Sequence, residues 1–350
     1  MSAGAVHPSP ESDLPGFGDV VAALGRLSPR LVRTPVASAP GFDALCDRRV
    51  YLKCENLQHG GAFKYRGALN ALLLRPACAS HQPVATHSSG NHGTALALAA
   101  RALGLHCHVV IPQDASAAKL AALQAAGASV RRCAPGLAAR EAALADWLAE
   151  SPAHLVHPFD DARVIAGQGT AALELLCERP DLDVVAVPVG GGGLLGGTAL
   201  AARGAKPGCR VVGVEPALAD DTWRSFASGR REGVAGSPAT IADGLRGSIG
   251  ARNFELLLRH VDEVLVVSER SIVAAMRLVL EHFRMLVEPS SAVPIAALLE
   301  GRLGRPGERV GVVVSGGNVD LAGCPFLAGE RLAATAPAPG GARAATGRGA

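Results

Sequence analysis

Residues 184–202 read VVAVPVGGGGLLGGTALAA and carry no charge over about the length of a membrane-spanning helix. Six glycines and Pro188 interrupt the run and disfavour one continuous helix. A buried strand over VVAVPV, a glycine-rich turn and a helix account for the same residues. The stretch therefore predicts one βα unit of an α/β fold, and a membrane partner is not expected.

Apolar runs alternate with Ala- and Leu-rich stretches along the rest of the chain. The expected strands are 50–54, 83–87, 108–112, 129–133, 183–189, 210–215, 263–267 and 309–314. The expected helices are 62–74, 92–103, 116–126, 137–150, 163–177, 194–204 and 269–283. This alternation predicts a largely parallel sheet covered on both faces, with ligands at the carboxyl ends of its strands.

The composition narrows the function classes. The 350 residues include 34 Lys and Arg against 31 Asp and Glu, with 8 Phe, 2 Tyr and 2 Trp, so neither a basic stripe nor a stacking platform for nucleic acid is expected. A hydrophobic fraction of 49% is enough to build two packed lobes. The eight cysteines lack paired spacing, and the N-terminal segment lacks the pattern of a signal peptide, so we expect reduced thiols and a cytoplasmic location.

Four glycine-rich segments follow expected strands: LQHGGAFKYRGALN (57–70), HSSGNHG (87–93), VGGGGLLGG (189–197) and SGGNVD (315–320). Because backbone N–H groups at helix starts bind anions, four such turns favour one anionic ligand over ordinary turn chemistry. Residues 191–196 also match the dinucleotide pattern G-x-G-x-x-G, with Glu215 ending the next strand, so a nicotinamide-dependent oxidoreductase is a second interpretation. Lys64 opens an apolar helix, where desolvation favours the neutral, nucleophilic amine.

Together these segments resemble the pyridoxal-phosphate enzymes of fold type II, in the serine and threonine dehydratase and serine racemase family. The resemblance covers residues 20–325 and rests on ENLQ (55–58), FKYRGALNA (63–71), THSSGNHG (86–93), IAGQGTAALE (165–174), VPVGGGGLL (187–195), TIADG (240–244), VEPSSA (287–292) and SGGNVD (315–320). It implies an α/β fold of two lobes, each with a mostly parallel sheet flanked by helices. The large cofactor-binding lobe would comprise 15–82 and 154–326, the small substrate-closing lobe 83–153, and the polar segments 1–14 and 327–350 are expected to be disordered tails.

The resemblance implies pyridoxal 5'-phosphate as the cofactor. Lys64 would bond to it and later move the substrate Cα proton, while Phe63 packs beside it. Asn91 would hydrogen-bond the ring oxygen, and Ser315 would face the pyridine nitrogen. The phosphate would be wrapped by the backbone N–H groups of Gly190, Gly191, Gly192, Gly193 and Leu194. The nicotinamide interpretation then loses its best evidence.

The same resemblance assigns the substrate carboxylate to a loop with Ser88, Ser89, Asn91 and His92. Two roles stay open for Ser89: a carboxylate contact, or proton exchange on the face opposite Lys64, which would permit racemisation. Arg140 is expected on the substrate side. Gly247 stands where serine racemase has a serine, which favours threonine or a larger substrate such as 3-hydroxyaspartate paired with Arg140.

Glu215 and Asp221, with the carbonyl of Ala219, are implied to bind a divalent cation, Mg²⁺ or else Ca²⁺ or Mn²⁺. The expected function is a pyridoxal-phosphate-dependent ammonia-lyase that dehydrates a β-hydroxy-α-amino acid of the L-threonine or L-serine type to a 2-oxo acid and ammonia. The alternatives are a serine or aspartate-like racemase with eliminase activity, or a 3-hydroxyaspartate ammonia-lyase. The family implies a homodimer.

Overall fold

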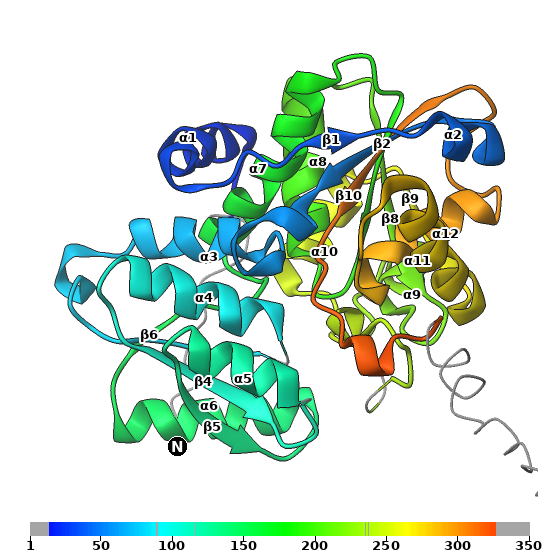
Figure 1. Ribbon diagram of the computed structural model, residues 1–350. Helices are drawn as coiled ribbons and strands as arrows, with labels where there is room; N and C mark the ends of the chain where they lie inside the picture. The colour runs from blue at the N-terminus through cyan, green and yellow to red at the C-terminus, as the bar shows by residue number, and fades with distance from the viewer. Residues whose placement is uncertain (1–13, 89, 116, 235, 237, 327–350) are drawn as a thin grey trace, which may run out of the picture.

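The computed structural model describes residues 14–326 except 89, 116, 235 and 237. Two β-sheets, each covered by helices, lie side by side (Figure 1). We call the six-stranded sheet and its helices the large lobe, and the four-stranded sheet and its helices the small lobe. Apart from Leu14, the expected disordered tails lie outside the described residues.

The large-lobe sheet has the strand order β1-β2-β10-β7-β8-β9. Its strands are β1 (Val36–Ala37), β2 (Arg49–Cys54), β7 (Val184–Pro188), β8 (Arg210–Pro216), β9 (Glu263–Val267) and β10 (Arg309–Val314). All neighbours pair in parallel except β1, which runs antiparallel to β2. The carboxyl ends of the parallel strands therefore share one edge, where the glycine-rich turns begin.

Both faces of this sheet are buried. Its helices are α1 (Phe17–Leu27), α2 (Pro40–Cys46), α3 (Lys64–Leu73), α7 (Ala162–Glu178), α8 (Gly193–Ala205), α9 (Asp221–Ser228), α10 (Ala251–His260), α11 (Glu269–Phe283) and α12 (Pro289–Leu299). Along β7, Val184 and Ala186 pack in a core with α11 and α12, while Val185 and Val187 pack in a core with α7 and α8. Burial on both faces explains why this strand is apolar at every position.

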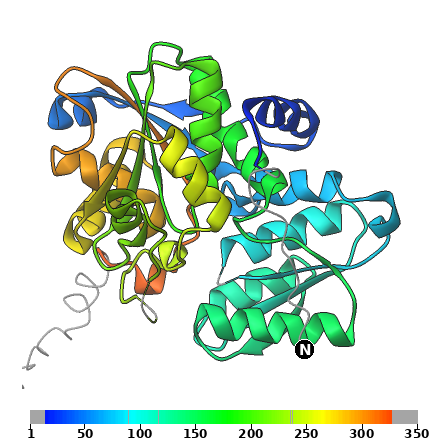
Figure 2. The same ribbon diagram turned by 180° about the vertical axis from the view of Figure 1, so that it is seen from behind.

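The small-lobe sheet is parallel and has the order β5-β4-β3-β6. Its elements are β3 (Val84–His87), β4 (Cys107–Pro112), β5 (Ser129–Cys133), β6 (His154–Leu155), α4 (Asn91–Ala102), α5 (Ala117–Ala125) and α6 (Leu137–Glu150). Leu96 of α4 and Leu123 of α5 pack on one face, and Leu144 of α6 packs on the other. The view from behind shows this lobe beside the large one (Figure 2). The division of the chain into lobes at 82/83 and 153/154 stays a prediction. Strand β6 belongs to the small-lobe sheet, although its residues 154–155 come just after the second predicted boundary.

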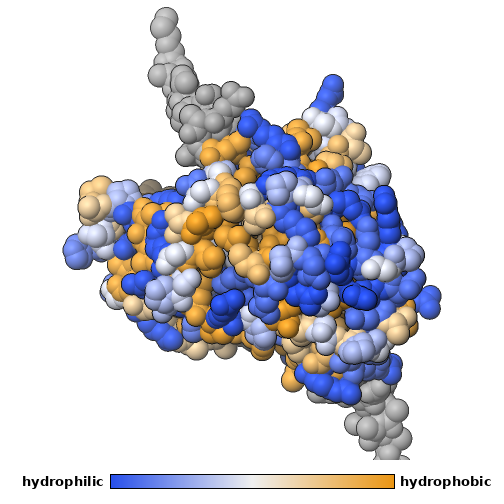
Figure 3. Space-filling model, turned by 90° about the horizontal axis from the view of Figure 1, so that it is seen from above, coloured by the Kyte–Doolittle hydropathy of each residue, from blue (hydrophilic) through white to orange (hydrophobic). Residues whose placement is uncertain are grey.

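The observed architecture confirms the expected α/β fold of two mostly parallel sheets. The run 184–202 forms β7, a turn and most of α8. Within the described residues, no helix has the length and apolar character needed to cross a membrane. On the face seen from above, hydrophobic residues lie between hydrophilic ones (Figure 3). Exposed apolar side chains include Val21 of α1, Leu45 of α2 and Trp223 of α9.

Candidate active site

The turn between β7 and α8 presents main chain only. Residues 190–193 are glycines, and Gly192 caps α8 with a φ of +86°. A Cβ on Gly191 would lie 2.2 Å from Cγ of Phe159, so no side chain fits there. Among the described residues, the N–H groups of 190–194 donate no hydrogen bond within the protein. Unpaired N–H groups at the start of a helix bind anions, and this turn fits a phosphate group.

Lys64, the first residue of α3, lines the same cavity as this turn. Its Nζ donates a hydrogen bond to the carbonyl oxygen of Pro158 at 3.1 Å and lies 5.0 Å from the ring centroid of Phe63. Burial lowers the pKa of Lys64 to about 8, although the charge of Glu288 opposes the shift. Near neutral pH this amine therefore has a larger neutral, nucleophilic fraction than an ordinary lysine.

A buried ion network fixes the helix that carries Lys64. Arg66 binds both oxygens of Glu55, at 2.7 and 2.8 Å, and both oxygens of Glu174, at 2.8 and 2.9 Å. Lys53 pairs with Glu174 at 2.7 Å, so two cations balance two carboxylates away from solvent. The network joins the ends of β2 and α3 to α7. No local sequence pattern predicts that Arg66, Glu55, Glu174 and Lys53 meet, because they come from separate segments of the chain.

The turns after β2 and β10 meet at the same edge. The backbone N–H of Phe63 donates to the carbonyl oxygen of Ser315, and that of Gly317 donates to Gly61, each at 2.9 Å. The Ser315 hydroxyl is buried and lies 2.9 Å from the hydroxyl of Ser291. These contacts bring Lys64 and Ser315, which are far apart in the sequence, to one cavity.

The cavity between the lobes contains nearly every residue expected at a cofactor or substrate site. The expected residues that line it are Phe63, Lys64, Ser88, Asn91, His92, Arg140, Gly190, Gly191, Gly192, Gly193, Leu194 and Ser315. Ser89 lies outside the described residues. Expected contacts of these residues with a cofactor or substrate remain predictions.

Glu288 is a buried carboxylate in this cavity that the sequence analysis did not identify, although it lies within VEPSSA. Asn91 Nδ2 donates to both of its oxygens, at 2.8 and 3.0 Å, and Asn318 Nδ2 donates to Asn91 Oδ1 at 3.0 Å. Burial raises the pKa of Glu288 to about 7, despite these hydrogen bonds from Asn91.

The side of the cavity facing α6 is cationic. Arg140 Nε donates to the carbonyl oxygen of Gly136 at 3.3 Å, and among the described residues the guanidinium forms no ion pair. Lys119 of α5 pairs with Asp243 of the large lobe across the opening. Gly247 also lines the cavity, and a Cβ there would meet nothing within 4 Å, so the cavity has open space at this residue. The arrangement suits a substrate that carries a second anionic group.

Glu215 in β8 and Asp221 at the start of α9 lie outside this cavity, and both are fully buried. Glu215 accepts hydrogen bonds from the N–H groups of Thr222 and Trp223, and Asp221 accepts one from Ile249, but Oδ1 of Asp221 has no partner among the described residues. Burial and the charge of Asp221 raise the pKa of Glu215, and burial raises the pKa of Asp221 to about 6. A cation would relieve both shifts.

The described residues contain no group of three or more His, Cys, Asp or Glu side chains arranged to hold a metal. A cation at Glu215 and Asp221 would therefore need carbonyl or water oxygens as well, which Mg²⁺ and Ca²⁺ accept. The unpartnered Oδ1 of Asp221 is one carboxylate oxygen that such a cation could bind.

Comparison with known proteins agrees with the site. The family model described as "Pyridoxal-phosphate dependent enzyme" matches residues 27–316. The chain is 41% identical to a β-hydroxyaspartate dehydratase of Paracoccus denitrificans, over 89% of this chain and 99% of the relative. It is 40% identical to an L-threo-3-hydroxyaspartate ammonia-lyase of Saccharomyces cerevisiae, over 88% of this chain and 94% of the relative.

A crystal structure of serine racemase from Dictyostelium discoideum superimposes with a TM-score of 0.82 at 41% identity, covering 88% of this chain and 99% of the other. The described fold, the phosphate-sized glycine turn and the half-buried lysine accord with these matches. The chain therefore belongs to the fold type II family of pyridoxal-phosphate-dependent enzymes that includes serine racemases and hydroxyaspartate dehydratases.

Proposed function

We propose that the protein is an ammonia-lyase that converts 3-hydroxyaspartate to oxaloacetate and ammonia. The sequence alone favours dehydration of L-threonine or L-serine and leaves this reaction as an alternative, whereas the cavity residues and the relatives favour 3-hydroxyaspartate. The observation that carries it is Arg140, a cavity-lining guanidinium that has no ion pair among the described residues and faces a cavity with open space at Gly247. The names of the Paracoccus and Saccharomyces relatives support the same substrate class.

The residues present fit pyridoxal phosphate. The N–H groups of 190–194 would hold its phosphate, Lys64 would attach to it, and Ser315 would lie at its ring nitrogen. When bound, the cofactor supplies an aldehyde that captures an amine and a ring that draws electrons from the substrate Cα–H bond. Glycine and hydroxyl groups thus bind the cofactor, and the cationic side is left for the substrate.

The protein groups then have separate tasks. The N–H groups at the start of α4, next to Ser88 and His92, would hold the α-carboxylate. Lys64 Nζ would take the Cα proton, because its lowered pKa makes the neutral amine available. The Cα proton and the β-hydroxyl leave as water. One water is then consumed when the C–N bond of the dehydrated product is hydrolysed to a ketone and ammonia. The net change is one 3-hydroxyaspartate to one oxaloacetate and one ammonia.

The second candidate function is racemisation of serine or aspartate. The similarity to a serine racemase structure favours it, and Ser89 is the residue we propose for proton exchange opposite Lys64. Chiral chromatography of L-serine and L-aspartate after incubation with the holoenzyme tests this activity. Formation of the D-enantiomer faster than formation of 2-oxo acid would place racemisation first.

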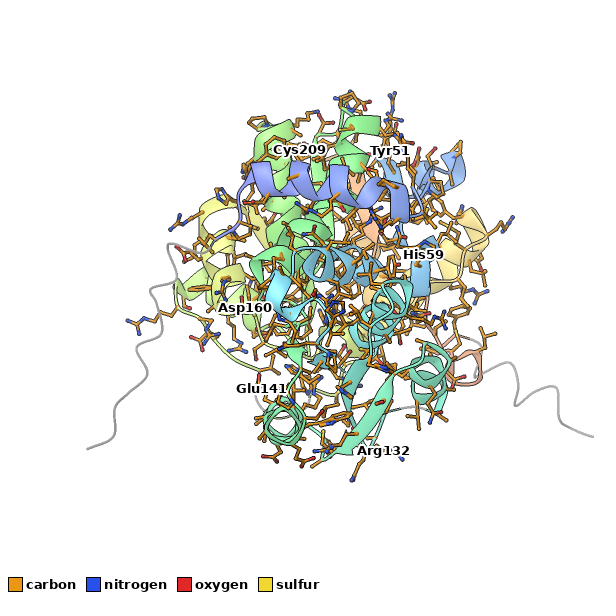
Figure 4. The ribbon with its side chains drawn as sticks, turned by 90° about the vertical axis from the view of Figure 1, so that its left-hand side faces the viewer. Tyr51, His59, Arg132, Glu141, Asp160 and Cys209 are labelled. Carbon is orange, nitrogen blue, oxygen red and sulfur yellow. The ribbon has the colours of Figure 1, made fainter. Side chains whose placement is uncertain are left out.

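The substrate assignment is tested by comparing kcat/KM for 3-hydroxyaspartate with that for L-serine. Losing a charged partner of a buried carboxylate costs about 2 kcal/mol or more, so we expect Arg140→Gln to lower the ratio of the two values at least about 30-fold. Arg132→Gln is the matched control, because Arg132 lies at the outer edge of the small lobe (Figure 4). Equal losses for both substrates in Arg140→Gln would contradict the assignment.

We also propose that Glu215, Asp221 and the carbonyl of Ala219 hold a divalent cation, preferably Mg²⁺, away from the reacting atoms. The unpartnered Oδ1 of Asp221 supports this proposal. The homodimer remains a prediction.

A further inference from the structure

His87 is a buried histidine that lines the cavity. It ends β3, directly before the loop that carries Ser88, and only 3% of its surface is exposed. It lines the cavity, yet its Nδ1 is buried without a hydrogen-bond partner among the described residues. Buried polar groups in native proteins are almost always paired, so an unpaired imidazole facing a cavity indicates a missing ligand.

His157 and Arg140 are the neighbours that determine the electrostatic surroundings of His87. Its ring lies 5.7 Å from that of His157, edge to face. His157 Nδ1 accepts hydrogen bonds from the N–H groups of Asp160 at 2.8 Å and Phe159 at 3.3 Å, which places its proton on Nε2. Arg140 lines the same cavity as His87, and its charge disfavours protonation of the imidazole. His87 and Arg140 line the cavity, whereas His157 packs behind His87, so the side chains that could donate to a ligand here are those of His87 and Arg140.

Burial, followed by His157 and Arg140, lowers the pKa of His87 to about 3. The imidazole is therefore neutral at physiological pH and offers one N–H donor rather than a positive charge. A neutral donor beside one guanidinium suits a carboxylate, which accepts several hydrogen bonds but needs only one counter-charge.

We propose that His87 and Arg140 together bind the β-carboxylate of the substrate, so that His87 is a specificity-determining residue for amino acids with a second carboxylate. This inference rests on the proposed function and deepens it. His92, whose two ring nitrogens are also buried without partners, lies near Lys64 and the proposed α-carboxylate site. Lys119 is engaged with Asp243. His87 is thus the unpaired donor beside Arg140.

The test measures recognition of the second carboxylate with and without turnover. In holoenzyme, we expect His87→Phe to lower the ratio of kcat/KM for 3-hydroxyaspartate to that for L-serine about tenfold, the effect of losing one hydrogen bond to a charged group. His87→Gln, which keeps an N–H donor, should recover part of the ratio. His108→Phe is the control, because His108 packs on Trp147 and does not line the cavity.

Isothermal titration calorimetry with succinate and propionate supplies a readout that needs no reaction. We expect His87→Phe to weaken succinate binding about tenfold relative to propionate. Equal loss of serine and 3-hydroxyaspartate turnover with unchanged succinate affinity would overturn the role of His87 and leave the proposed function standing. Loss of bound cofactor in both His87 variants would also overturn it, because His87 would then support the lobe instead of the substrate.

Failure of the proposed function gives a different result. Wild-type holoenzyme would then bind succinate with a dependence on His87 but release no ammonia from 3-hydroxyaspartate. The two failures are thereby distinguished in one set of proteins.

Discussion

Gly191→Ala adds one methyl group to the glycine turn between β7 and α8. The methyl group would point at Phe159, which lies between β6 and α7. The new Cβ would lie 2.2 Å from Cγ and 2.4 Å from both Cδ atoms of Phe159. Carbon atoms pack at about 3.5 Å or more, so the turn and the ring must separate by roughly 1.3 Å.

Phe159 cannot easily supply that movement. Its N–H donates to His157 Nδ1 at 3.3 Å, and its carbonyl oxygen accepts from Asn253 Nδ2 at 2.9 Å. The glycine turn therefore moves, and its N–H groups lose their alignment toward the phosphate. Overpacking of this kind costs about 1–3 kcal/mol, which corresponds to a cofactor dissociation constant roughly 5- to 150-fold higher.

The assay titrates apoprotein with pyridoxal phosphate and follows the absorbance of the bound cofactor. Gly208→Ala is the matched control, because Gly208 follows the other end of α8 and a Cβ there meets nothing within 4 Å. Urea unfolding of both apoproteins separates lost stability from lost affinity. A dissociation constant for Gly191→Ala within twofold of wild type, or an equal loss in Gly208→Ala, would refute the reasoning.

Three further predictions follow from buried charges. The rate at which pyridoxal phosphate attaches to apoprotein should rise with pH through a midpoint near 8, because burial lowers the pKa of Lys64 to about 8. Stopped-flow absorbance measures this rate, and a midpoint near 10 would contradict the prediction. Arg66→Met should lower the free energy of unfolding by about 3–5 kcal/mol in urea, since Glu55 and Glu174 lose the guanidinium that binds both; a loss below about 1 kcal/mol would be inconsistent with the network. Mg²⁺ should raise the Tm of wild type measured after chelation, and Asp221→Asn should remove most of that rise; an equal rise in both proteins would exclude Asp221 as a ligand.

Local sequence signals predicted the elements whose packing is regular. The strand at 263–267 and the helices at 137–150 and 269–283 have the expected ends, because turn residues and apolar periodicity act over a few neighbouring residues. Helix α12 was missed, since Pro294 within it normally argues against a helix. Burial of almost all its side chains against the sheet outweighs that local cost. The expected set also omitted α1, α2, α9, α10 and the two-residue strands β1 and β6.

The active site divides in the same way. The glycine turn and Lys64 are each recognised from their immediate sequence neighbours. The sequence alone therefore indicated an anion site and a reactive amine. Glu288 and Asn91 are 197 residues apart and become partners only when the start of α12 meets the start of α4 at the cavity. His87 looked like the end of a strand, because its unpaired nitrogen becomes visible only after folding. Long-range contacts of this kind leave no local pattern.

The most direct test of the account incubates purified holoenzyme with each stereoisomer of 3-hydroxyaspartate and measures ammonia and oxaloacetate together. We predict equal amounts of both products from at least one stereoisomer, with kcat/KM above that for L-serine or L-threonine, and no turnover by Lys64→Ala. Absence of oxaloacetate from every stereoisomer, with wild-type protein that holds its cofactor, would contradict the proposed function.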